Sequence, residues 1–447
     1  MPQADHIPDE VLAAYARDPG SHREIEEHLN SCGQCRKTVE TDQALASGMR
    51  QRETWRIEDE ITSQRGQLDA RNFGDRLDAE DQEAERILDT ILETPYTLAY
   101  ANITAKPRFR TGGVVRKLMA AALEQCHKDP KYALALAGTG ELILTQIPKN
   151  YYPAALFHNL RGNVLKDFAT VYRFLGKFDE AHRALARAEA AFKELTDDGM
   201  GLAAVKHGKA LLLRAQQRNA EALPLAREAA QEYEERNETL LYLETRETIA
   251  VITHELGDIP AAHALYRNLY DAAENLDNMT MKARCAKGLG VIARDGGDFG
   301  TASQYFLEAL QLYQAMGKDA MVVRMRWSIA RLSLMMGKAR DAAARLFEIR
   351  SALAERGMAS DAAEVDLDRV EAHLMLREYE YAHSICASLP AIFTQANMLL
   401  GALTAASYLK ELAELRRLTR RDVQHVRDYL TRLAKRPQLE FAPPDFR

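Results

Sequence analysis

Three short stretches, LGDIPAA (256–262), GGDFGTA (296–302) and MGKARDA (336–342), carry one signal at intervals of 40 residues. In each stretch a glycine lies five residues before the final alanine. Glycine readily takes the left-handed backbone conformation that ends an α-helix, and the residues after it begin the next helix. The three stretches therefore predict a helix-turn-helix unit that repeats every 40 residues.

The same layout extends in both directions along the chain. In each unit a residue of the first helix, small in most units, is followed twelve positions later by an alanine of the second helix. The pairs are Ala169 and Ala181, Ala210 and Ala222, Ala250 and Ala262, Gly290 and Ala302, Ala330 and Ala342, and Val370 and Ala382. Small residues allow two helices to approach closely. The second and sixth turns depart from the pattern, because Gln217 and Arg377 replace the glycine.

This pattern resembles the tetratricopeptide repeat family, and its 40-residue period resembles the longer-helix variants of that family. The resemblance implies an all-α fold in which helix pairs stack into a right-handed solenoid with a concave wall. We expect the solenoid to span 113–436, with a further helix pair at 114–126 and 129–144 and capping helices within 408–435. Residues 437–447 are expected to form a tail.

Composition places the chain among soluble globular proteins. Of its 447 residues 47% are hydrophobic and 28% are charged, and the net charge of -6 demands no nucleic acid as a partner. The sequence begins without a secretory leader and contains no apolar run of about 18 residues. Five scattered cysteines indicate a reducing compartment, so a cytoplasmic location is expected. Motifs for zinc proteases, nucleotide loops or nucleophile elbows do not occur, so we expect no enzyme.

Near the N-terminus, HLNSCGQC (28–35) places His28, Cys32 and Cys35 at positions i, i+4 and i+7 of a helix, on one face. Gly33 lets the backbone bend so that both sulfurs reach one ion. Thiolates with imidazole favour tetrahedral Zn2+. His6, ahead of a probable helix at 8–17, is the preferred fourth ligand. Asp5 and His22 are weaker alternatives, and buried free cysteines are the non-metal alternative.

Residues 6–39 resemble the zinc-binding anti-sigma domain, a small helical bundle with a His-x-x-x-Cys-x-x-Cys signature and one earlier ligand. The resemblance implies a zinc domain over residues 1–48 with His6, His28, Cys32 and Cys35 as ligands. It also implies that this bundle and the helix after it hold a bacterial sigma factor. The sequence departs from the family in its short loop at 18–24 and in lacking the membrane span of many relatives.

Residues 49–112 form a charged linker, expected to be helical in part and disordered in part, chiefly over 63–85. One apolar stripe consists of Trp55, Ile57, Ile61 and Leu68, and a second of Ile87, Leu88, Ile91 and Leu92. Apolar stripes outside a repeat must pack on something. Docking on the solenoid is the simpler interpretation for both, and the first stripe could instead hold a sigma factor.

The repeat register also predicts a basic inner wall on the first helices of the units. Its members are Lys166, Arg173, Arg214, Arg284, Lys287, Arg294 and Arg331. Few acids, among them Glu244 and Glu247, are expected to oppose them, so an acidic peptide or protein would suit this wall. The simpler alternative is ordinary charge on helix surfaces.

Two functions follow as expectations. The first is a cytoplasmic anti-sigma-like transcription regulator, whose zinc domain sequesters a sigma factor while its solenoid senses a protein partner or signal. The alternative is a protein-interaction scaffold with a purely structural zinc cap. Neither function needs direct contact with nucleic acid or membrane.

Overall fold

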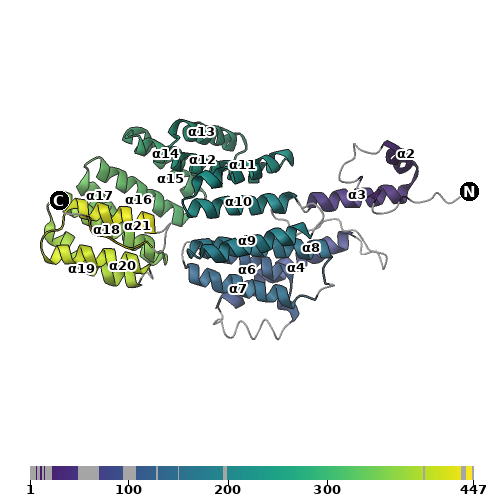
Figure 1. Cartoon of the computed structure of the whole chain (residues 1–447), viewed down its shortest axis with the longest axis horizontal. Coiled ribbons are helices and arrows are strands. Elements are labelled where there is room, and N and C mark those ends of the chain that lie inside the picture. Colours follow the sequence, from purple (N-terminus) through teal and green to yellow (C-terminus); the bar gives the residue numbers. More distant parts are fainter. Residues whose placement is uncertain are drawn as a thin grey trace, which may run out of the picture.

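The computed structural model describes residues 7, 11–12, 15, 23–48, 70–93, 107–126, 129–148, 151–194, 199–395, 398–433 and 439–444. Within these ranges the chain forms nineteen α-helices and one short 3-10 helix, and no strand, which confirms the all-α fold (Figure 1). The stripe of Trp55, Ile57, Ile61 and Leu68 lies outside the described residues, as does His6.

The solenoid begins with α6 (Gly112–Gln125) and α7 (Pro130–Gln146). The helices that follow are α8 (Ala154–Phe174), α9 (Phe178–Lys193), α10 (Gly199–Ala215), α11 (Asn219–Glu235), α12 (Thr239–Glu255), α13 (Ile259–Asn275), α14 (Met279–Asp295), α15 (Phe299–Ala315), α16 (Asp319–Met335), α17 (Ala339–Glu355), α18 (Ala359–Met375) and α19 (Tyr379–Gln395). From α11 to α19 every helix has 17 residues and begins 20 residues after the one before it. The structural repeat is therefore one helix and one three-residue turn, half of the 40-residue unit read from the sequence.

All nine turns from α10 to α19 have the same backbone. The residue at 217, 237, 257, 277, 297, 317, 337, 357 or 377 has a positive φ between 50° and 88°. At Gly257 the amide donates to His254 O at 2.9 Å, and the next amide donates to Thr253 O at 3.2 Å, which is a Schellman cap. Gln217 and Arg377 make the same two bonds. The turns without glycine are thus confirmed as turns of the same kind.

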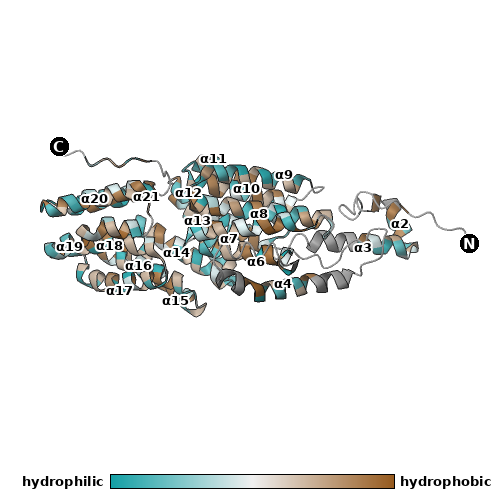
Figure 2. Ribbon diagram, turned by 90° about the horizontal axis from the view of Figure 1, so that it is seen from below, coloured by the Kyte–Doolittle hydropathy of each residue, from teal (hydrophilic) through white to brown (hydrophobic). Residues whose placement is uncertain are grey.

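The small residues lie where the helices meet. Ala181, Ala222, Ala262, Ala302, Ala342 and Ala382 are all fully buried. A Cβ atom on Gly290 would lie 2.6 Å from the ring of Phe306, so this inner helix can approach α15 only without a side chain there. Figure 2 shows polar and apolar residues alternating along each helix, as expected for elements that bury one face. The predicted packing of the repeat is therefore confirmed.

The helices α8, α10, α12, α14, α16 and α18 are here called the inner helices, and α9 to α19 with odd numbers the outer helices. Contacts join α8 to α10, α10 to α12, α12 to α14 and α16 to α18. In the described part of the chain, successive outer helices contact one another less. The stack therefore curves with its inner helices on the concave side.

A charged helix covers the first end of the solenoid. α4 (Ala70–Glu93) packs on α6 and buries Leu77, Ala84 and Ile87 in the solenoid core. Asp81 pairs with Arg116, and the Glu85 carboxylate lies 3.1 Å from Lys117 Nζ. The expected disorder of 63–85 was wrong for residues 70–85, because a sparse apolar stripe among many charges is enough to dock a helix. Docking of the second stripe is confirmed at Ile87 and Leu88.

The other end is closed by α20 (Leu400–Glu414) and α21 (Arg420–Leu433). α20 packs on α19, whereas α21 packs on α20 and on the inner helix α18. Residues 439–444 then return over α21, where the Phe441 ring contacts Tyr408 and Tyr429. Figure 1 places these elements and the N-terminal helices at opposite ends of the molecule.

Candidate metal cluster and basic inner wall

The His28, Cys32 and Cys35 side chains lie at a break between two helices. α2 (Arg23–Ser31) ends just before Cys32, and α3 (Gly33–Gly48) begins just after it. The amide of Cys32 still donates to His28 O at 2.8 Å, and the amide of Arg36 to Cys32 O at 3.1 Å. The chain thus keeps its helical spacing on both sides but is not one continuous helix. The break falls beside Gly33, as the proposed bend requires.

Arg36 satisfies the exposed end of α2. Its Nε donates to Leu29 O at 2.9 Å, and its terminal nitrogen donates to Asn30 O at 2.8 Å. The last carbonyl groups of a helix have no partner within the helix and carry partial negative charge, so a guanidinium stabilises them. Sequence reasoning did not identify this role, although a cation one residue after the second cysteine was visible.

The three side chains form a cluster that can hold a metal ion. Their ligand atoms all lie within 4.8 Å of one another, and His28 Nε2 is 3.4 Å from Cys35 Sγ. Bond lengths of about 2.0–2.3 Å in a tetrahedral zinc site place ligand atoms roughly 3.5–3.8 Å apart. The cluster therefore needs a contraction of about 1 Å to surround Zn2+. Cys35 is only 2% exposed, which leaves the site shielded from solvent.

A very small apolar core surrounds this cluster. It consists of Leu12, Tyr15, Ile25, Leu29, Cys32, Cys35 and Val39. A core of this size supplies little of the free energy that folding needs, whereas structural Zn2+ contributes on the order of 10 kcal/mol. Two of the core residues are the cysteines themselves. The local fold and the metal site are therefore one unit.

The fourth ligand falls outside the described residues, because His6 and its alternatives Asp5 and His22 are not among them. Ile7, the residue after His6, packs against the apolar core that contains both cysteines. No described helix is both long and apolar enough to cross a bilayer.

On the basic inner wall, three of the predicted cations pair with acids of the neighbouring inner helix. Arg214 donates to Glu255 on α12 at 2.8 and 3.1 Å. Arg284 on α14 pairs with Glu247 on α12. Arg331 Nε lies 3.6 Å from Asp368 on α18. The expectation of few opposing acids was wrong here, since acids 37 to 41 residues away face these arginines.

Two more of the predicted cations pair with the residue next to them in sequence. Lys166 Nζ is 2.9 Å from Asp167, and Arg294 donates to Asp295 at 2.7 and 2.9 Å. These contacts lie within one helix, so they hold the side chains along the helix surface and do not link neighbouring units.

Arg173 and Lys287 differ from these five, since no carboxylate within 4.0 Å pairs with either in the described ranges. Burial lowers the pKa of Arg173 to about 10, and the Arg214 guanidinium lowers it further. Burial also lowers the pKa of Lys287. The wall therefore has positive charge without an acid of its own at two places.

Sequence reasoning missed the groups at the far end of the same wall. Trp327 on α16 donates its indole N–H to Asp368. Arg427 on α21 lies 2.8 Å from both Asp368 and Glu371, and Arg420 lies 2.8 Å from Glu371. The signal was present in part, because Trp327 and Asp368 are 41 residues apart, close to one period. The acids of α18 are thus occupied by the last helix.

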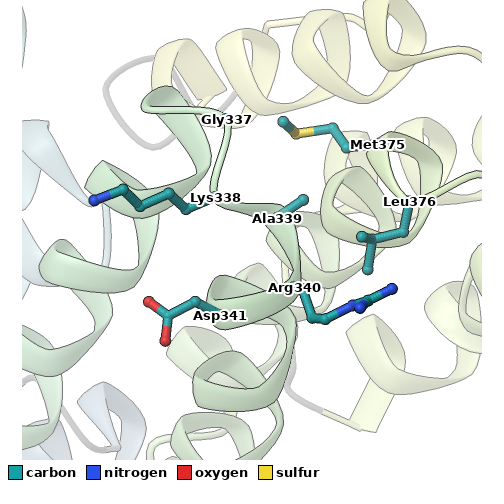
Figure 3. Close-up of a pocket in the computed structure, with 7 residues that line it drawn as sticks. All are labelled: Gly337, Lys338, Ala339, Arg340, Asp341, Met375 and Leu376. Atoms are coloured by element: carbon teal, nitrogen blue, oxygen red, sulfur yellow. The ribbon is translucent and has the colours of Figure 1, made fainter.

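An open hollow of about 500 Å³ lies elsewhere, between the turn after α16 and the end of α18. Figure 3 shows its lining residues, among them Lys338, Arg340 and Met375. None of the predicted site residues lines it. It therefore adds nothing to the metal cluster or the inner wall.

Neither a protein-family model nor a curated protein matches the sequence. Among solved structures, the chain is similar to a Signal Transduction ATPase with Numerous Domains from Pyrococcus horikoshii, described as having a tetratricopeptide repeat sensor. That likeness has a TM-score of 0.50 and 11% identity, and it covers 96% of this chain and 63% of the other. This chain thus spans less than two thirds of that protein.

Two further similar structures are of NprR. One is NprR in complex with its cognate peptide NprX, at 13% identity and a TM-score of 0.46, covering 71% of this chain and 88% of that one. The other is the apo quorum sensor NprR from B. thuringiensis, at 14% identity and a TM-score of 0.44, covering 80% and 99%. Identities this low show a shared fold alone, and the fold defined here is a tetratricopeptide-like α-solenoid preceded by a His-Cys-Cys cluster.

Proposed function

We propose that this protein is an anti-sigma-like transcription regulator of the bacterial cytoplasm, without catalytic activity. Its N-terminal segment binds Zn2+ through His6, His28, Cys32 and Cys35 and sequesters a sigma factor. Its solenoid binds a second protein or a peptide on the inner wall. The observation that carries the proposal is the cluster of His28, Cys32 and Cys35 inside a seven-residue apolar core.

Two further features support the proposal. Ile7 packs on the core that holds both cysteines, which favours His6 as the fourth ligand. The stripe of Trp55, Ile57, Ile61 and Leu68 directly follows the cluster in sequence and supplies a second apolar surface for a partner helix. A metal-stabilised bundle followed by an amphipathic helix can enclose a helical partner from two sides.

The test is co-purification of the full-length chain with sigma factors of its own organism. Wild type should retain one of them and contain one Zn2+ per chain. Cys32→Ser should lose both, whereas Cys285→Ser, a buried cysteine of the solenoid, should lose neither. Ile57→Asp combined with Ile61→Asp should lose the sigma factor and keep the zinc. Retention of the sigma factor by both the Cys32 and the double variant would overturn the proposal.

The scaffold function remains the second candidate, and one observation favours it. The solenoid has its own closing helices, α4 at one end and α21 at the other, and these bury apolar residues without help from the zinc segment. A scaffold with a structural zinc cap would retain its partners through the solenoid and bind no sigma factor. Capture of unchanged partners by Cys32→Ser would therefore favour the scaffold.

A further inference from the structure

The middle of the inner wall brings four successive inner helices to one point. Lys287 on α14 lies within electrostatic range of Arg214 on α10, Glu247 on α12 and Arg324 on α16. Helices α10 and α14 are not neighbours, so an interaction between their charges requires that the wall curve inward there. Lys287 is thus a half-buried lysine on the concave side, with its flanks formed by other inner helices.

The arginines around Lys287 are each held by a carboxylate. Arg214 pairs with Glu255, Arg284 with Glu247, and Arg324 Nε lies 2.8 Å from Asp361. Each bridge joins two neighbouring inner helices and fixes the guanidinium in place. Lys287 has no such bridge among the described residues, although it is the group they surround.

The charge of Lys287 is accordingly poorly compensated. Burial lowers the pKa of its ammonium group, and Arg284, Arg324 and Arg214 lower it as well, whereas Glu247 acts in the opposite direction. A buried charge is costly unless a partner satisfies it. A ligand carboxylate at this point would supply the missing partner in a charge-assisted hydrogen bond.

The acidic end of the wall does not compete for such a ligand. Arg427 and Arg420 of α21 already bind Asp368 and Glu371 of α18. A ligand with a basic group therefore finds those carboxylates occupied. An acidic group finds an uncompensated cation at Lys287.

We propose that Lys287 is the anchoring residue of the solenoid's binding site and takes one carboxylate of an extended peptide, with Arg214, Arg284 and Arg324 completing a positively charged seat. This inference deepens the proposed partner-binding role of the solenoid and rests on it. The carboxylate can come from an Asp or Glu side chain or from a free C-terminus, and both sources offer the same chemistry to the lysine.

The experiment uses the full-length protein, immobilised, and three pools of eight-residue peptides with randomised neutral flanks. The first pool has a central Glu-Asp pair and an amidated C-terminus, and the second has Gln-Asn in its place. The third has Gln-Asn with a free C-terminal carboxylate. Retention of the first or third pool over the second is expected, and the retained pool identifies the source of the carboxylate.

Peptides from the retained pool are then measured by fluorescence anisotropy. Lys287→Gln should bind them about tenfold more weakly, and Lys287→Arg should recover most of the affinity because it restores the charge. Lys318→Gln is the matched control, since it removes an exposed lysine from a turn, and it should bind as wild type does. Circular dichroism of each variant confirms that it is folded.

Three outcomes would overturn the inference: equal retention of all pools, retention of none, or wild-type affinity in Lys287→Gln. Retention of an octamer of deoxythymidine in place of the peptides would also overturn it, because the seat would then serve phosphates. Cys32→Ser should bind the peptides unchanged. Loss of sigma-factor binding with intact peptide binding would thus defeat the proposed N-terminal function and leave Lys287 in its role.

Discussion

The N-terminal segment and the solenoid solve the same problem, burial of apolar surface by short helices, in opposite ways. The segment around Cys32 has a core of seven residues, two of which are metal-ligand candidates. Every solenoid helix from α11 to α19 buries one face between its neighbours, and one 20-residue plan is repeated nine times. In the first region a single ion determines the fold. In the second, no single contact does, because stability is distributed over adjacent helices.

Loss of one metal ligand should have the largest effect in this comparison. Cys32→Ser removes a thiolate from a site worth on the order of 10 kcal/mol, so residues 23–40 should unfold while the solenoid keeps its melting temperature. Metal analysis and limited trypsin digestion would follow the two regions separately. Cys386→Ser, a fully buried cysteine of the solenoid, should keep one Zn2+ per chain. A Cys32→Ser protein that still carries zinc would contradict the ligand assignment.

Overpacking one helix contact should have the next largest effect, now in the solenoid. Gly290→Val places a side chain where even a Cβ would lie 2.6 Å from Phe306, so we expect a loss of about 3 kcal/mol in unfolding free energy. Urea denaturation measures this loss, and the zinc content should not change. Gly300→Val is the control, because a Cβ at Gly300 meets nothing closer than Asp298 Oδ1 at 3.5 Å. Equal stability of the two variants would show that the inner and outer helices are not in close contact.

Relief of backbone strain at a turn should have a smaller effect and the opposite sign. Arg377 adopts a φ of 60°, which a residue with a side chain adopts at a cost of about 1 kcal/mol. Arg377→Gly should therefore raise the unfolding free energy by about 1 kcal/mol. Gly357→Ala is the converse, because Gly357 has a φ of 71° with open space around it, and it should lower stability by a similar amount. Thermal melts with opposite shifts are the expected result, and shifts of the same sign would refute a shared turn geometry.

The smallest expected effect depends on pH. Burial raises the pKa of Glu364 to about 7, and Asp361 adds to the rise. The folded state thus holds a proton that the unfolded state releases at lower pH, so this group makes the fold less stable as the pH rises towards 7. Glu364→Gln should melt higher than wild type at pH 8 and nearly the same at pH 4.5. A difference that does not change with pH, or an equal gain in the control Glu348→Gln, would rule out this source.

Much of the solenoid could be predicted because its signals are local. Alanines and glycines at fixed spacing reported the packing, and the buried Ala181 and Ala382 confirm it. The true period of one helix could not be read, because Asn237 and Asp277 take the left-handed conformation without glycine. α4 was missed since three buried residues, Leu77, Ala84 and Ile87, are spread among charges.

The two candidate sites differ in the same way. His28, Cys32 and Cys35 are close in sequence, so their spacing was enough to predict the cluster. The partners of the inner-wall arginines lie 37 to 41 residues away, and only a superposition of neighbouring units brings them together. Arg427 pairs with Glu371 across 56 residues through a helix outside the repeat, which no periodic pattern could indicate.

Hydrogen exchange of the full-length chain, measured by mass spectrometry with zinc bound and again after chelation, tests the central claim most directly. The account predicts that peptides from residues 25–39 lose their protection when the metal is removed, while helices α10 to α19 exchange as before. Unchanged protection of residues 25–39 without metal would contradict it, because the N-terminal segment would then fold on its seven-residue core alone.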